Sequence, residues 1–68
     1  MQNKWIKVYS NPQLYMVEIV KSVLHDNGIE TVILNKQDSA YIPIGEVELY
    51  APPQNADIAQ NIISINNL

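Results

Sequence analysis

The sequence predicts an α+β domain in which a strand, a helix, two further strands and a second helix follow one another. Three observations lead to this fold class. Polarity alternates over residues 4–9 and 46–51, apolar residues recur at helical spacing over 12–27, and a β-branched run occupies 29–34. With 68 residues the chain is expected to form one domain (1–68) around one small core.

The first strand is expected at residues 4–9, because side chains of alternating character occupy the two faces of a strand. Ile6 and Val8 are expected to point into the core. The opposite face is expected to carry the remaining side chains, namely Trp5, Lys7 and Tyr9.

A helix is predicted from about Pro12 to Asn27. Asn11 is a candidate N-cap, and Pro12 suits the first helical position because the missing N–H has no partner there. The apolar stripe of this helix is expected to consist of Met16, Val17, Ile19, Val20, Val23 and Leu24. Gly28 is expected to close the helix in a left-handed conformation, which glycine adopts without a Cβ penalty.

The second strand is predicted at 29–34, and a loop is predicted at 35–45. In the third strand, at 46–51, the inward side chains are expected to be Val47, Leu49 and Ala51, and the outward ones Glu46, Glu48 and Tyr50. Pro52 and Pro53 end this strand, since proline cannot donate to the ladder, and Pro53 can open the last helix.

The last helix is expected to bury a stripe of isoleucines, Ile58, Ile62 and Ile65, and its end at residues 66–68 is expected to fray. Right-handed connection of the first two strands makes them parallel and places the third strand antiparallel between them, in the order 1-3-2. The expected result is a two-layer sandwich with both helices on one face of the sheet. This is a ferredoxin-like βαββα arrangement without a fourth strand, so the edge of the first strand stays free.

Charge and composition restrict the function. The net charge is −3 and there is no arginine, so nucleic-acid binding is not expected. The chain has no cysteine, a single histidine and no serine next to a paired base, so we expect no metal, no cofactor and no catalytic residue. No apolar run approaches the length of a membrane helix, and no signal segment is apparent, so a cytoplasmic protein is expected.

Four segments carry a resemblance to a known family: WIKVYS at 5–10, LYxxEIVK at 14–21, NGIExVILNKQDS at 27–39 and GEVELY at 45–50. Over about 5–65 the chain resembles the small "putative prokaryotic signal transducing protein" family. The resemblance implies a compact PII-like variant of the ferredoxin-like fold and a regulatory role. It implies no particular ligand and no catalytic residue.

The loop after the second strand is one candidate site. Its first five residues bring one cation, one anion and several hydrogen-bonding groups together, and they are Asn35, Lys36, Gln37, Asp38 and Ser39. In a PII-like sensor these groups would hold a small anionic metabolite, with Lys36 as the cation. The alternative is that Asn35 and Asp38 close local turns in a solvated loop.

The sheet face opposite the helices is the second candidate site, as a contact surface for a protein partner or a second copy. Its expected interface residues are Trp5, Lys7, Tyr9 and Tyr50, and Val32 and Leu34 could extend it. The alternative is ordinary half-buried packing of the aromatic rings. For Glu46 and Glu48, solvated pairing with Lys7 across the sheet is favoured over acid–base catalysis. A non-enzymatic interaction module is therefore the leading expectation, with the metabolite sensor as the alternative.

Overall fold

The computed structural model describes residues 4–36 and 45–68 of the chain. Within them the order of elements is the predicted one. The elements are β1 (Ile6–Asn11), α1 (Leu14–Asp26), β2 (Val32–Asn35), β3 (Val47–Ala51) and α2 (Pro53–Ile65). The predicted helices and strands are all present, with bounds that differ by at most three residues.

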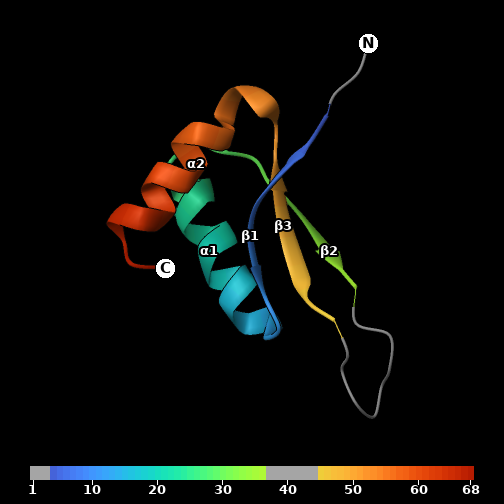
Figure 1. Cartoon of the computed structure of the whole chain (residues 1–68). Coiled ribbons are helices and arrows are strands. Elements are labelled where there is room, and N and C mark those ends of the chain that lie inside the picture. The colour runs from blue at the N-terminus through green and yellow to red at the C-terminus, as the bar shows by residue number, and fades with distance from the viewer. Residues whose placement is uncertain (1–3, 37–44) are drawn as a thin grey trace.

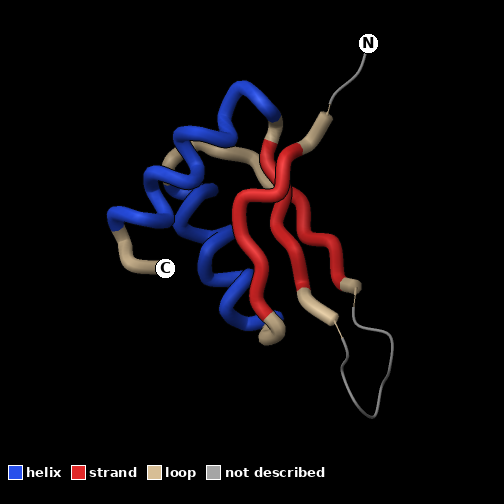
Figure 2. Tube along the Cα trace, in the orientation of Figure 1, coloured by secondary structure: helices blue, strands red, loops and turns tan. Residues whose placement is uncertain are grey.

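The three strands form one sheet in the order β1-β3-β2, and both outer strands run antiparallel to β3. Both helices cover the same face of this sheet, and over residues 4–36 and 45–68 the opposite face carries no helix (Figures 1 and 2). The predicted two-layer α+β sandwich is therefore confirmed, and its topology is consistent with a ferredoxin-like fold.

A β-bulge interrupts the pairing of β1 with β3. Lys7 is opposite Tyr50, whereas Tyr9 is opposite Leu49, so one extra residue is accommodated in β1 between them. Because the extra residue reverses the alternation, Tyr9 turns to the helix side and packs against the core. The prediction that Tyr9 lies on the uncovered face is wrong for this reason.

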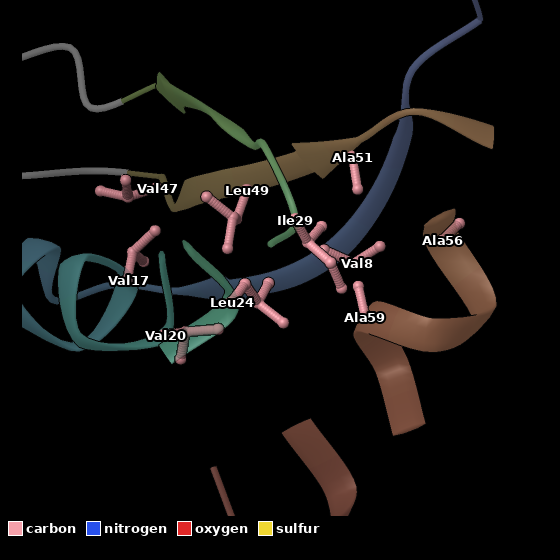
Figure 3. Packing of buried hydrophobic residues seen from close by; sticks show 10 residues of the cluster. All are labelled: Val8, Val17, Val20, Leu24, Ile29, Val47, Leu49, Ala51, Ala56 and Ala59. Carbon is pink, nitrogen blue, oxygen red and sulfur yellow. The ribbon is translucent and has the colours of Figure 1, made fainter. Parts of the chain in front are cut away.

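The core lies between the sheet and the helices, and Figure 3 shows its ten buried hydrophobic residues. They are Val8, Val17, Val20, Leu24, Ile29, Val47, Leu49, Ala51, Ala56 and Ala59. The inward residues predicted for β3 are confirmed. Ile6, predicted to be buried, is exposed, because it is the first residue of β1 and lies where the sheet ends. Ile19 is also exposed, since the buried stripe of α1 is narrower than expected.

Helix α1 begins at Leu14, two residues later than predicted, although Asn11 does accept a backbone bond. The Asn11 Oδ1 atom accepts the Gln13 N–H at 2.8 Å, and Gln13 occupies the cap position. The end of α1 is as predicted. Gly28 has φ +80°, and the N–H groups of Gly28 and Ile29 donate to the carbonyls of His25 and Leu24.

Helix α2 begins at Pro53 as predicted but faces the sheet with different residues. Its buried side chains are Ala56 and Ala59, whereas Ile58 is 54% exposed and Ile65 is 70% exposed. The predicted isoleucine stripe is therefore wrong for Ile58 and Ile65, whereas Ile62 packs against the core as predicted. The alanines take its place because their small side chains let the helix backbone approach the sheet closely.

The end of α2, for which the sequence predicts fraying, is closed by main-chain hydrogen bonds. Asn67 has φ 57°, and its N–H donates to the Ser64 carbonyl at 3.2 Å. The Leu68 N–H donates to the Ile63 carbonyl at 3.0 Å, and the Leu68 side chain packs against the core. These bonds form the same closing motif as at Gly28, with asparagine tolerating the left-handed position.

Candidate functional site

The sheet face opposite the helices gathers side chains from all three strands. We call this surface the open face. Strand alternation and pairing place on it Lys7, Val32, Leu34, Lys36, Glu48 and Tyr50, with Trp5 beside them. One half of the open face is apolar and the other half is charged.

The apolar half is a shallow depression lined by Trp5, Val32, Leu34 and Tyr50. Val32 lies opposite Tyr50 in the β2–β3 ladder, and Leu34 follows on the same side of β2. The side chains of Trp5, Val32 and Leu34 are 41%, 50% and 45% exposed, respectively. The predicted meeting of Trp5 and Tyr50, and the extension by the two aliphatic residues of β2, are therefore seen in the structure.

Glu48 forms the centre of the charged half. The Tyr50 hydroxyl donates to Glu48 Oε1 at 2.7 Å. The Lys36 ammonium lies 3.4 Å from Oε1, and the Lys7 ammonium lies 3.6 Å from Oε2. These partners cover the carboxylate so that Glu48 is only 8% exposed, while both lysines remain half-exposed.

This environment keeps Glu48 ionised. The hydrogen bond from Tyr50 and the two nearby ammonium groups lower the pKa of Glu48 below its ordinary value, although partial burial acts in the opposite direction. The same hydrogen bond raises the pKa of Tyr50. The predicted pairing of Glu48 with Lys7 is confirmed, but the pair is not fully solvated. The carboxylate thus holds the two lysines in place and donates no proton at neutral pH.

The predicted loop site is only partly within the described residues. Asn35 ends β2, and Lys36 continues the ladder, since its N–H donates to the Glu46 carbonyl at 3.2 Å. The Lys36 side chain belongs to the open face through Glu48. The other residues of the predicted site, Gln37, Asp38 and Ser39, lie outside the described residues. One sequence signal indicates that Lys36 belongs to the open face. It follows Leu34 by two residues, and such residues lie on the same side of an extended segment.

Of the predicted interface residues, Tyr9 is not part of the open face. It packs on the core side, and its hydroxyl accepts a hydrogen bond from the Asn11 amide at 3.3 Å. The other three, Trp5, Lys7 and Tyr50, are brought together on the open face.

A second depression lies beside α1 and the segment that follows it. It is lined by Glu18, Lys21, Ser22, His25, Glu30 and Thr31. The Lys21 ammonium donates to the Thr31 carbonyl at 2.8 Å and so ties the helix to this segment. Over residues 4–36 and 45–68, no three His, Asp or Glu side chains are grouped so that they could hold a metal ion. In the same part of the chain, neither helix is long and apolar enough to cross a membrane.

Comparison with known proteins identifies the family. A family model described as "Putative prokaryotic signal transducing protein" matches residues 5–65, a range that contains every helix and strand of the structure. The searches of curated proteins and of solved structures returned no match. The resemblance seen in the sequence motifs is confirmed, and the chain belongs to the family of putative prokaryotic signal transducing proteins.

Proposed function

We propose that this protein is a non-enzymatic regulatory module of the prokaryotic cytoplasm that acts by binding another protein through its open face. The observation that carries the proposal is the apolar depression formed by Trp5, Val32, Leu34 and Tyr50 on the helix-free side of the sheet. Apolar side chains in such a position stabilise the isolated fold little, so their clustering favours a contact role.

The arrangement around the depression supports a protein contact. Interfaces commonly combine an apolar centre, enriched in aromatic rings, with a polar rim. Here the rim consists of Lys7 and Lys36, which are paired with Glu48 and still half-exposed. A partner can therefore cover the apolar centre without leaving a buried charge unpaired.

The state of Glu48 argues against a role as general acid. A general acid needs a pKa raised toward neutrality, whereas the hydrogen bond from Tyr50 lowers the pKa of Glu48. The two lysines and the phenol all bind the Glu48 carboxylate, so the cluster is suited to holding a shape.

Site-specific crosslinking tests this function. A photo-crosslinkable amino acid in place of Leu34 should trap the same protein repeatedly in cells, whereas one in place of Ile58 should not. Ile58 is a matched control because it is a similarly exposed aliphatic residue on the helix layer. A Val32→Ser exchange should remove the crosslink formed from position 34. Equal crosslinking from both positions, or none from position 34, would contradict a docking role of the open face.

A second function is favoured by one observation, the two lysine ammonium groups beside a single carboxylate on the open face. Together they leave a local excess of one positive charge, which would suit a small anionic metabolite. A thermal-shift screen with phosphate, nucleotides and phosphorylated sugars tests this sensor function, because a ligand of the native state raises the melting temperature. Lys36→Ala should abolish such a shift, and Lys4→Ala should preserve it. Absence of any shift would contradict the sensor function for these ligands.

A further inference from the structure

The depression beside α1 is formed by a polar stripe of that helix and by the segment that leads into β2. The helix contributes side chains at helical spacing, which project from one side of it, namely Glu18, Lys21, Ser22 and His25. Glu30 and Thr31 complete the lining. Its volume of about 530 Å³ lies within the range of small-molecule sites, roughly 300–1,000 Å³. The depression is therefore large enough for a small molecule.

The Lys21 ammonium is held at this depression without a counter-ion. It donates to the Thr31 carbonyl at 2.8 Å, and the Lys21 side chain is half-buried. Within the described residues, ion pairs occur on the open face, and Lys21 pairs with neither Glu18 nor Glu30. An ammonium group has three N–H donors, so two of them remain for a ligand. The bond to the main chain thus positions a positive charge for an anionic group.

The Thr31 hydroxyl is a second donor that has no partner. Thr31 is 6% exposed, and over residues 4–36 and 45–68 its buried Oγ1 atom makes no hydrogen bond. Buried polar atoms without a partner are uncommon in native structures and destabilise the fold. The hydroxyl belongs to the residue whose carbonyl holds Lys21, so the two donors are close to each other. A ligand anion that meets the Lys21 ammonium is therefore near the Thr31 hydroxyl as well.

The two carboxylates of the depression restrict which anions can bind. Glu18 and Glu30 are both exposed, and neither forms an ion pair in the part of the chain that the structure describes. They repel a ligand that carries negative charge alone, and they attract an ammonium group. The Lys21 ammonium likewise repels a ligand that carries positive charge alone. The charges therefore match a molecule in which a carboxylate and an ammonium lie close together.

We propose that this depression binds a free amino acid. The ligand's carboxylate accepts hydrogen bonds from Lys21 and, as the ammonium moves off the Thr31 carbonyl, from the Thr31 hydroxyl. The ligand's ammonium lies between Glu18 and Glu30. A protein terminus carries one of these two charges and not the other, so it does not satisfy both sides of the site. None of the lining residues belongs to the open face, so the site is separate from the proposed docking surface.

A thermal-shift screen with the standard amino acids at millimolar concentration tests the ligand class. At least one of them should raise the melting temperature, because a ligand of the native state stabilises it. The amide of that amino acid lacks the carboxylate and its N-acetyl form lacks the ammonium, so neither should produce the shift. A shift of equal size with either derivative, or no shift with any amino acid, would overturn the proposal.

Nuclear magnetic resonance titrations of variants test the residues. Lys21→Met keeps the aliphatic stem and removes the ammonium, so it should raise the Kd by roughly tenfold or more. Thr31→Val should raise the Kd by about threefold to tenfold, since one hydrogen bond is lost. This variant is expected to be more stable than the wild type without ligand, so weaker binding would not reflect unfolding. Lys4→Met, which removes an exposed lysine outside the depression, should leave the Kd unchanged.

The acids are tested in the same way. Glu18→Gln and Glu30→Gln together should weaken binding of the amino acid, whereas Glu46→Gln should not. Unchanged binding in Lys21→Met, or in the double glutamine variant, would place the amino acid elsewhere and overturn the proposal. Crosslinking at position 34 does not depend on these residues, so a failure of the amino-acid site and a failure of the docking function are distinguishable.

Discussion

The two faces of the central strand β3 have different chemistry although they share one backbone. The helix-covered face carries Val47, Leu49 and Ala51, all fully buried and all apolar. The open face carries Glu48 and Tyr50. The Tyr50 hydroxyl donates to Glu48, and the Glu48 carboxylate also pairs with two lysines. The first set accounts for the fold. The second set, together with the exposed apolar groups beside it, lies outside the apolar core, and we expect function there.

The largest expected effect is the difference in stability between replacing Leu49 on the covered face and replacing Leu34 on the open face. Leu49 is fully buried, so Leu49→Ala should lower the free energy of unfolding by about 2–5 kcal/mol, which is most of the stability of a domain this small. Leu34→Ala, at a half-exposed position, should lower it by about 1 kcal/mol or less. Urea denaturation of both variants measures the difference. Equal losses would show that the open face is structural.

Acid sensitivity should distinguish Glu48 from the exposed Glu46. Because the folded-state pKa of Glu48 lies below the ordinary 4.5, its ionised form stabilises the fold above that pH, and this stability is lost as pH falls through the lowered value. The melting temperature of each protein is compared with its own value at pH 7. Between pH 5 and pH 3 it should therefore decline less for Glu48→Gln than for the wild type. Glu46→Gln should follow the wild-type curve. Identical curves for all three proteins would mean that the cluster does not stabilise the fold.

The phenol of Tyr50 gives a spectroscopic check on the same cluster. Its hydrogen bond to Glu48 raises its pKa above the ordinary 10.0, so the stability that it contributes is present below pH 10 and is lost as pH rises through the raised value. Ultraviolet titration of the wild type should therefore contain a late component that belongs to Tyr50. Tyr50→Phe should remove this component, and Glu48→Gln should shift it to lower pH. A late component that survives Tyr50→Phe would belong to another ring.

The smallest expected effect is a gain in stability, from a substitution on the covered side of the sheet. The Thr31 hydroxyl is buried and has no hydrogen-bond partner in the structure. Thr31→Val keeps the shape and removes an unsatisfied polar atom, so it should raise the free energy of unfolding by up to about 1 kcal/mol. Chemical denaturation measures the change, with Ser22→Ala on the exposed side of α1 as a control. A loss of stability would show that the hydroxyl has a partner in solution.

The order of elements and the layers were predictable because they depend on residue types with strong local meaning. Alternation marked β3, Gly28 marked the end of α1, and Pro53 marked the start of α2. The errors come from features that only packing decides. Alanine gives no strong signal of burial, yet Ala56 and Ala59 are the buried residues of α2. Asn67 closes α2 with a conformation that is less common for asparagine than for glycine.

The candidate site was predictable in part. Tyr50 lies on the outward side of its strand and Trp5 lies next to a strand, so both residues line the apolar depression, as expected. Lys36 was assigned to a loop, and its pairing with Glu48 was missed, because it depends on the register between β2 and β3. The sequence alone did not indicate that Glu48 is nearly buried, since outward-facing carboxylates are normally solvated.

The bulge in β1 has a consequence for evolution within the family. One extra residue after Lys7 decides whether the aromatic ring of Tyr9 belongs to the core or to the open face. A relative that lacks this residue would turn its ring outward, so its binding surface would gain an aromatic group and its interior would lose one. A single-residue insertion or deletion could thus change partner preference while every strand and helix stays in place. Alignment gaps near position 8 should therefore be examined as functional differences between relatives.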